Sequence, residues 1–241
     1  IYCNVYEFPE YNDERLSVGP HLVFAEESFS KIKPGEIHDV TLEAWILLND
    51  WDENAGIISR PFFDTSDSAS QRFPFVMFKL GRNGVTQQAQ FQVTRLVLDV
   101  DPSLKDKEVE PRLSLASVRS TSSVVRGEWM HIAATYQSST GTLALYFNGQ
   151  LENVFEASPA GVLIGKQNAP LFIARTSSGV EKQNFYGSLD EVRVWSKALS
   201  ESNIARRFKN KLYGDEAGIV LYVNGESGTD ADASLNSVAD R

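Results

Sequence analysis

The chain has 241 residues, of which 42% are hydrophobic and 11% aromatic, so it can bury a substantial core as one large β-rich domain or two small ones. Its formal net charge of −9 argues against a nucleic-acid or anionic-membrane partner. No apolar run is long enough to cross a bilayer, and the single cysteine, Cys3, excludes an internal disulfide and a multi-cysteine metal site. Because the chain begins at Ile1 without a signal-peptide pattern, we expect a processed product or a piece of a longer protein.

The first half of the chain predicts strands separated by polar turns. Residues 1–15, which are rich in tyrosine, predict an extended strap over the domain, and residues 16–24 predict a strand around Gly19. The stretch from Val40 to Leu48 alternates, with one face formed by Val40, Leu42, Ala44, Ile46 and Leu48. Further strands are expected at 57–59, 73–80 and 89–100, with a hairpin turn at 82–84.

The turn at 49–56 is the first candidate binding site. It offers an aromatic ring, Trp51, with Asp50, Asp52 and Asn54 beside it, which suits a sugar ring and its hydroxyl groups. The alternative is an ordinary solvated turn, since Asp, Asn and Gly are common turn residues.

The second half predicts a hairpin, a loop and a closing unit. Strands are expected at 129–136, 143–147 and 170–174, and we assign a structural role to His131, which has no partner in the local sequence. The loop 175–184 leads into the strand 185–195 and supplies a second candidate site, formed by Arg175, Asn184 and Tyr186. A helix at 201–209 with Ser200 as its N-cap, a strand at 218–223 and a polar tail at 224–241 follow.

The strand 185–195 carries a carboxylate in an unusual place. Strict alternation predicts that Asp190 shares a face with Val192 and Val194, while Leu189, Glu191, Arg193 and Trp195 take the other. A carboxylate on an apolar face needs backbone N–H groups, a cation or water.

Three stretches resemble laminin G-like and pentraxin-like domains, and together they cover roughly residues 16–223. They are the strand Val40–Ile46, the hairpin formed by 127–136 and 145–149, and the closing run from Phe185 to Trp195 with the short helix after it. The resemblance implies an all-β fold: a two-sheet antiparallel jelly-roll sandwich, with one short helix near the C-terminus, as a single domain over residues 1–241.

The resemblance also implies metal binding in some relatives. Pentraxins place carboxylates after the strand that corresponds to 170–174, but this chain has Arg175, Thr176 and two serines there, which argues against a pentraxin-type calcium site. Other relatives hold one structural calcium ion with an Asp at the position of Asp190 and backbone carbonyl groups, of which Gly19 could supply one. The alternative is that Asp190 accepts hydrogen bonds from backbone N–H groups.

Catalysis is not expected. Glucan-cleaving enzymes of the same superfamily carry a Glu-x-Asp-x-x-Glu strand, which occurs nowhere in this chain. We therefore predict a non-catalytic recognition module, extracellular or at the cell surface, that binds a glycan or a protein and belongs to a multidomain protein. The alternative is an accessory domain of a larger enzyme with no free ligand of its own.

Overall fold

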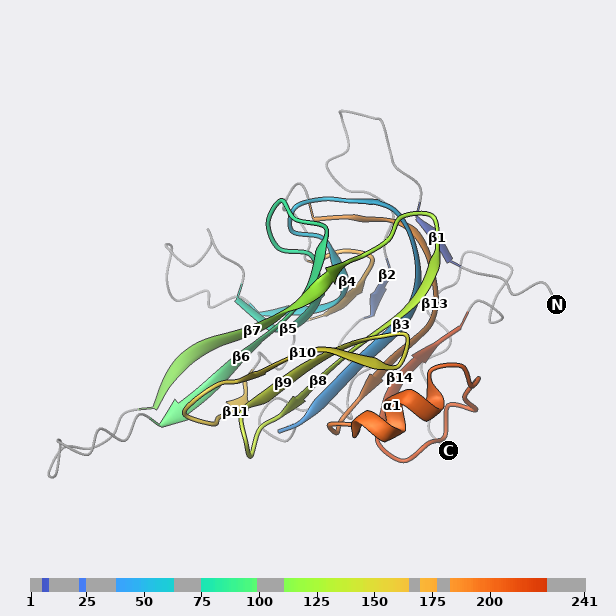
Figure 1. The fold of residues 1–241 in the computed structure, drawn as a ribbon. Helices are drawn as coiled ribbons and strands as arrows, with labels where there is room; N and C mark the ends of the chain where they lie inside the picture. The colour runs from blue at the N-terminus through green and yellow to red at the C-terminus, as the bar shows by residue number, and fades with distance from the viewer. Residues whose placement is uncertain are drawn as a thin grey trace, which may run out of the picture.

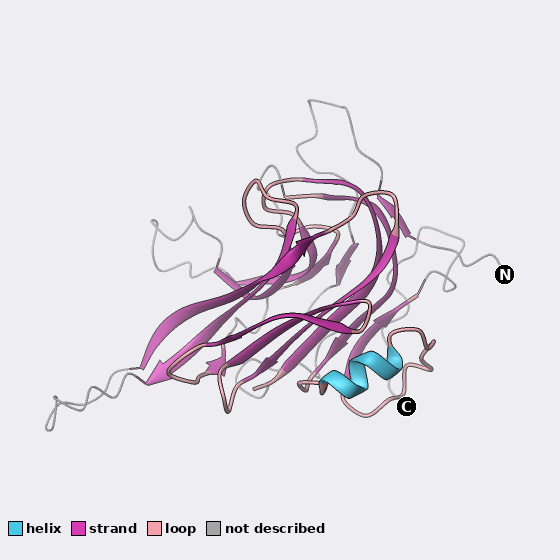
Figure 2. Cartoon of the chain, in the orientation of Figure 1, coloured by secondary structure: helices cyan, strands magenta, loops and turns pink. Residues whose placement is uncertain are grey.

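The computed structural model describes residues 6–8, 22–24, 38–62, 75–98, 111–164, 170–176 and 183–224. Within these ranges the chain forms two antiparallel sheets of seven strands each and one short helix (Figures 1 and 2). This confirms the predicted two-sheet sandwich. Gly19, most of the predicted strap at 1–15 and all but the first residue of the tail at 224–241 lie outside the described residues. No described helix is long and apolar enough to cross a membrane.

The first sheet, called sheet A, has the strand order β1-β13-β3-β8-β9-β10, and β14 pairs with β13. Its strands are β1 (Tyr6–Phe8), β3 (Val40–Trp51), β8 (Trp129–Gln137), β9 (Thr142–Phe147), β10 (Gln150–Glu156), β13 (Phe185–Trp195) and β14 (Ile219–Val223). The tight turn between β9 and β10 has Asn148 and Gly149 at positive φ, as the Asn-Gly pair predicts.

The second sheet, sheet B, has the order β11-β6-β5-β4-β12-β2, and β7 pairs with β6. Its strands are β2 (Leu22–Phe24), β4 (Gly56–Phe62), β5 (Phe75–Gly81), β6 (Gln88–Leu98), β7 (Pro111–Ser123), β11 (Val162–Leu163) and β12 (Leu171–Ile173). Neither β7 nor β10 was predicted from the sequence. Both lie at exposed margins of the sandwich, where polar residues occupy most positions and the hydrophobic alternation is weak.

The main core fills the space between the two sheets. The five alternating residues of β3 are all at most 1% exposed and belong to it. A smaller apolar cluster lies on the outer face of sheet A, beneath the helix α1 (Glu201–Arg207), and includes Trp195, Ile204 and Tyr222. Strand β3 is therefore buried on both faces.

Helix α1 begins where the sequence predicts. Ser200 is its N-cap and accepts from the N–H of Asn203, and Ile204 is fully buried. The helix lies against sheet A, away from the turn that joins β3 to β4 (Figure 1). This turn and the start of β13 form the region described next.

Candidate functional site

The two candidate loops of the sequence analysis meet at one end of the sandwich. The N–H of Asp52 donates to the carbonyl oxygen of Asn184 at 2.9 Å, and the N–H of Asn184 donates to Asp52 Oδ2 at 2.8 Å, although the residues are 132 positions apart. A bridge between Arg175 and Asn184 joins the end of β12 to the start of β13. In Figure 1 the blue-to-cyan turn and the orange start of β13 lie together at the top of the view. We call the region formed by 50–54, Arg175, Asn184 and Tyr186 the rim site.

Side-chain hydrogen bonds link the members of the rim site. Asp52 Oδ2 lies 3.5 Å from the hydroxyl group of Tyr186, and Asn184 Nδ2 donates to the same hydroxyl at 3.3 Å. Arg175 is fully buried, and its Nη1 donates to Asn184 Oδ1 at 2.6 Å. Asp52 and Tyr186 are half-buried, so the site presents a carboxylate and a phenol to solvent above a rigid polar base.

Two side-chain hydrogen bonds fix the backbone of Asn54. Its carbonyl oxygen accepts from Thr176 Oγ1 at 2.5 Å and from Lys79 Nζ at 3.1 Å, while its side chain is exposed. Lys79 is only 3% exposed, and this burial lowers the pKa of its ammonium group to about 7. The turn is thus held by groups from both β5 and the segment after β12.

Trp51 does not have the expected position. The sequence predicted an exposed ring for sugar stacking, but Trp51 is 2% exposed and its Nε1 donates to Gln87 Oε1 at 2.8 Å. The prediction is wrong because β3 continues through residue 51, so that the ring enters the core between the sheets. Trp51 therefore anchors the turn of the rim site in the core and is not a surface for ligand stacking.

Asp50 lies at the edge of the rim site and pairs with a cation. Its Oδ1 accepts from Arg126 Nη2 at 2.6 Å and from the N–H of Trp51 at 2.8 Å. In the strand register Asp50 is opposite Tyr186, so the two side chains share a face.

Asp190 lies on the opposite face from the one predicted. A bulge between Asp190 and Arg193 breaks the alternation of β13, with Glu191 at φ +50°, so that Leu189 and Val192 both enter the main core. Asp190 is instead opposite Trp45 on the outer face of sheet A, is half-buried, and accepts from the N–H of Glu191 at 2.8 Å.

The argument for a calcium ion at Asp190 was that its carboxylate lies on an apolar face. Because Asp190 lies on the outer face instead, that argument is incorrect. Within the described ranges no group of three or more His, Cys, Asp or Glu residues could hold a metal ion. Calcium binding itself stays a prediction, because the second predicted ligand, Gly19, lies outside these ranges.

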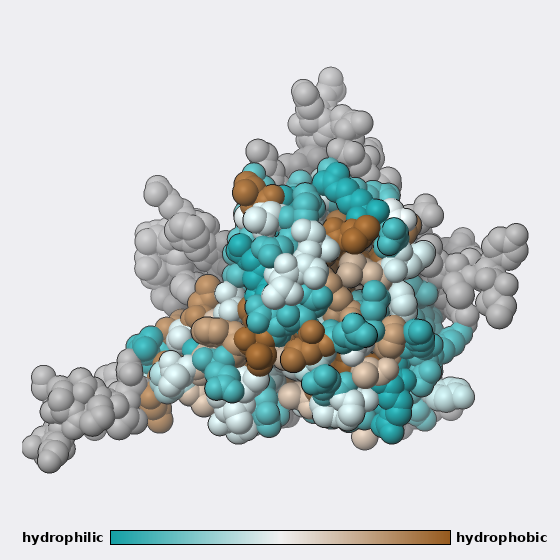
Figure 3. All heavy atoms as spheres, viewed as in Figure 1, coloured by the Kyte–Doolittle hydropathy of each residue, from teal (hydrophilic) through white to brown (hydrophobic). Residues whose placement is uncertain are grey.

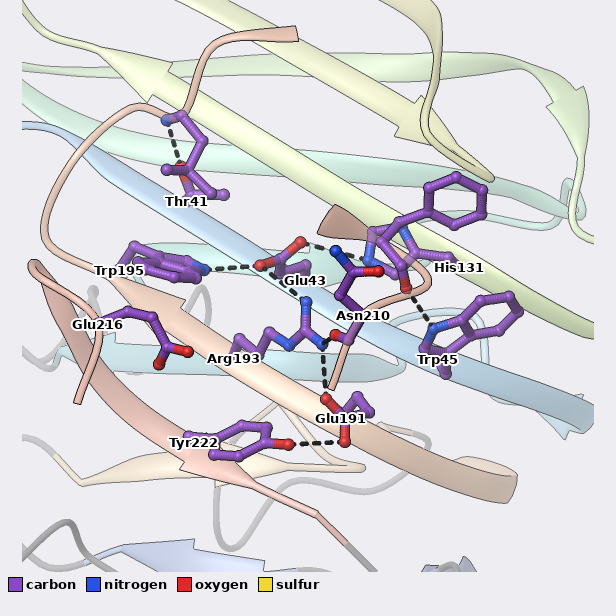
Figure 4. Close-up of polar contacts among 12 residues, drawn as sticks. Thr41, Glu43, Trp45, His131, Glu191, Arg193, Trp195, Asn210, Glu216 and Tyr222 are labelled. Atoms are coloured by element: carbon purple, nitrogen blue, oxygen red, sulfur yellow. Dashed lines mark hydrogen bonds and ion pairs between the residues drawn. The ribbon is translucent and has the colours of Figure 1, made fainter. Parts of the chain in front are cut away.

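The outer face of sheet A carries an ion network that was not predicted from the sequence (Figure 4). Glu43 is completely buried, and its Oε1 accepts from Trp195 Nε1 at 2.7 Å and lies 3.6 Å from Arg193 Nη1. His131, also completely buried, places Nε2 at 3.3 Å from Glu43 Oε2. A signal for it exists: Glu43 and Arg193 each precede a Trp by two residues, which puts opposite charges beside aromatic rings on neighbouring strands.

This network joins sheet A to the segment after α1. Arg193 Nη2 donates to the carbonyl oxygen of Asn210 and to Glu191 Oε2, both at 2.6 Å. The hydroxyl of Tyr222 donates to Glu191 Oε1 at 2.7 Å. Burial alone would raise the pKa of Glu43, but its close contact with His131 and the charge of Arg193 outweigh the effect of burial and hold this pKa below its ordinary value. Glu43, His131 and Arg193 are at most 1% exposed, whereas Glu191 keeps 14% of its side chain exposed. The buried centre of the network agrees with the structural role assigned to His131 from the sequence.

The fold and its elements define a jelly-roll domain of the lectin type. The family model for the concanavalin A-like lectin/glucanases superfamily matches residues 27–205. The chain belongs to this superfamily. No curated protein matches the sequence.

Solved structures of similar fold include carbohydrate-binding domains. A protein from Bacteroides ovatus to which carbohydrate binding is ascribed has a TM-score of 0.59 at 17% identity, over 92% of this chain and 51% of its own. The chain therefore spans about half the length of that protein. The CBM40 domain of the Ruminococcus gnavus IT-sialidase, bound to α2,6-sialyllactose, has a TM-score of 0.54 at 14% identity, over 84% of this chain and 95% of its own. At these identities the likeness establishes the fold alone.

Proposed function

We propose that this chain is a non-catalytic glycan-binding module, extracellular or at the cell surface, within a larger multidomain protein. Its ligand site is the rim site, with Asp50, Asp52, Asn54, Arg175, Asn184 and Tyr186. The observation that carries the proposal is the convergence of two loops 132 residues apart, joined by paired hydrogen bonds between Asp52 and Asn184.

The chemistry of the rim site suits sugar hydroxyl groups. A sugar is recognised by an aromatic surface flanked by rigid hydrogen-bonding groups, and Tyr186 with Asp52 and Asn54 supplies this combination. Arg175 and Asn184 are buried and already bonded to each other, so their role is to fix the position of the two contacting side chains.

Substitution of the two contacting residues tests the proposal. Asp52→Ala and Tyr186→Ala are each expected to weaken binding to a positive glycan by about tenfold or more, since each removes a hydrogen-bonding group from the ligand. The ligand is found on a glycan and polysaccharide array, run with calcium and with chelator, and affinities are then measured by calorimetry.

Tyr213→Ala is the matched control for this experiment. Tyr213 is 93% exposed and lies in the segment after α1, so its loss removes an accessible tyrosine that is not part of the rim site. An equal loss of affinity in all three variants, or unchanged affinity in Asp52→Ala and Tyr186→Ala, would reject the rim site as the glycan site.

A second candidate function is an accessory domain that packs against a neighbouring domain. One observation favours it: an apolar patch on the outer face of sheet B near the β6–β7 end. In the strand register Val162, Leu96 and Leu113 are neighbours, with Leu98 and Leu115 two positions further along their strands. Leu98, Leu113 and Leu115 are 57%, 42% and 56% exposed. Contiguous exposed apolar groups of this kind mark contact surfaces.

A further inference from the structure

The outer face of sheet A continues from the rim site toward β8. Strands β13, β3 and β8 run side by side in this sheet (Figure 1). Phe185 and Leu189 of β13 both lie in the main core. Tyr186 and Ser188 occupy the alternate positions, so their side chains lie on the outer face.

Trp129, the first residue of β8, lies on the same face. The next residue, Met130, enters the main core, so Trp129 points the other way. In the strand register Trp129 is opposite Leu47, and Leu47 is opposite Ser188. These three residues form one row across the sheet, and Tyr186 lies one step further along β13 toward the rim.

Trp129 is the most exposed of the four tryptophans of the chain. Its exposed fraction is 41%, whereas Trp51 and Trp195 are at most 2% exposed and Trp45 is half-buried. On the side away from the rim, Trp45 donates its indole N–H to the carbonyl oxygen of Phe208 at 2.8 Å and stacks on the Phe208 ring. The exposed aromatic surface of Trp129 therefore extends toward the rim site and not toward α1.

Polar groups fill the space between Tyr186 and Trp129. With about 4.8 Å between strands and about 3.4 Å per residue along them, the Cα atoms of these two residues are about 12 Å apart. Asp50 is opposite Tyr186 and bonds to Arg126, which precedes β8, and the two side chains are 43% and 49% exposed. The register shift leaves Asn49 without a partner on β13, and its side chain is exposed. The face thus has an aromatic ring at each end and accessible polar groups between them.

We infer that the glycan site extends from the rim site to Trp129, so that it binds a run of several sugar units and not a single terminal sugar. The inference rests on the proposed function and adds the class of ligand, an oligosaccharide or the interior of a polysaccharide chain. A sugar chain repeats apolar ring faces and hydroxyl groups, which match aromatic rings separated by hydrogen-bonding groups. Trp129 binds a unit of a chain that the rim already holds, so its contact adds affinity without a second loss of translational freedom.

The test measures affinity against chain length. The probes are oligosaccharide series from cellulose, xylan, β-mannan and β-galactan, each from the monosaccharide to the hexasaccharide, and calorimetry gives the affinities. Wild-type protein is expected to bind the hexasaccharide of at least one series about tenfold or more tightly than the monosaccharide.

Variants separate Trp129 from the rim. Trp129→Thr removes the ring but keeps a residue that favours strands, and it is expected to lower hexasaccharide affinity about tenfold while leaving monosaccharide affinity unchanged. Trp129→Phe keeps a ring and is expected to retain most of the hexasaccharide affinity. Tyr186→Ala is expected to weaken binding at every chain length by a similar factor, because every probe contacts the rim. Tyr213→Ala, at a 93% exposed tyrosine after α1, is the control and is expected to change neither affinity.

Three results overturn the inference alone. They are equal wild-type affinity at all chain lengths, a dependence on length that Trp129→Thr keeps, and binding on the glycan array without binding to any of the four series. The wild-type series decides the first of these even if Trp129→Thr does not fold. Absence of binding to the array as well would overturn the proposed function, and the inference with it.

Discussion

Glu43 is an ionised group in an enclosed position, and its partners decide whether it stabilises the fold. It is surrounded by Arg193, His131 and the indole N–H of Trp195, with no exposed surface. A buried ion pair gives little net stability relative to an apolar replacement, but removal of one partner leaves an uncompensated charge. The residues of the network are therefore mutually dependent.

Glu43→Gln is expected to lower the free energy of unfolding at neutral pH by about 3 kcal/mol, since Glu191 is then the one anionic partner left to Arg193 among the described residues. In the wild-type protein the pKa of Glu43 is held below its ordinary value of 4.5. Its stabilising contribution is thus fully present above pH 4.5 and is lost as the pH falls through the lower, folded-state pKa.

Urea unfolding between pH 3 and 7 measures both effects. Glu156→Gln is a suitable control, because Glu156 is an exposed residue at the end of β10. A variant of Glu43 with the same stability and the same acid dependence as the control would show that the network contributes nothing.

At the scale of elements, the pairing of β13 with β3 places the rim site. Its register shifts between Tyr186 and Gly187, which keeps Asp50 opposite Tyr186 and brings Asn184 to Asp52. Gly187 has φ +152°, and a Cβ atom at this position would lie 2.1 Å from the carbonyl oxygen of Leu47. Only glycine fits there without movement of the backbone.

Gly187→Ala is expected to destabilise the protein by about 2–4 kcal/mol and to weaken glycan binding, because the clash displaces the start of β13 that carries Tyr186. Gly84→Ala is the control, since Gly84 has φ +91° but no atom within 4 Å of the added Cβ. The control is expected to cost about 1–2 kcal/mol through backbone strain alone and to keep its affinity. Chemical denaturation measures the stability of the two variants, and calorimetry measures their glycan affinity. Equal losses of stability and affinity in the two variants would contradict the role assigned to Gly187.

For the whole molecule, the sequence predicted the sandwich far better than the site. The core residues of β3 follow a strict alternation, so they could be identified from spacing alone. Asp190 was assigned to the wrong face because strict two-residue alternation was assumed along β13. The bulge at Glu191, which interrupts this alternation, cannot be recognised from the sequence pattern. Trp51 was misplaced because a polar stretch that looks like a turn continues the strand. Contacts between distant loops, such as Asp52 with Asn184, depend on the tertiary structure and not on local pattern.

The surface as a whole offers a further test. In Figure 3 it is mostly hydrophilic, with hydrophobic residues gathered in a band across the lower part of the view, where β7 and β10 run in Figure 1. If the apolar patch of sheet B is a domain contact, the isolated chain is expected to self-associate weakly through it. The double change Leu113→Ser and Leu115→Ser is expected to abolish concentration-dependent association in sedimentation velocity, whereas Val85→Ser, which removes an apolar side chain that is 74% exposed in the turn between β5 and β6, is not. Identical behaviour of both variants and the wild type would argue against the accessory role.

The buried position of Trp51 gives the rim site an optical property. Its indole lies directly behind Asp50 and Asp52, hydrogen-bonded to Gln87 and with the guanidinium carbon of Arg82 5.9 Å from its ring centroid. Indole fluorescence responds to nearby charge and to solvent polarity. A ligand that binds at the turn between β3 and β4 is therefore expected to change the fluorescence of Trp51. The residue that does not touch the ligand can thus report its arrival without a label.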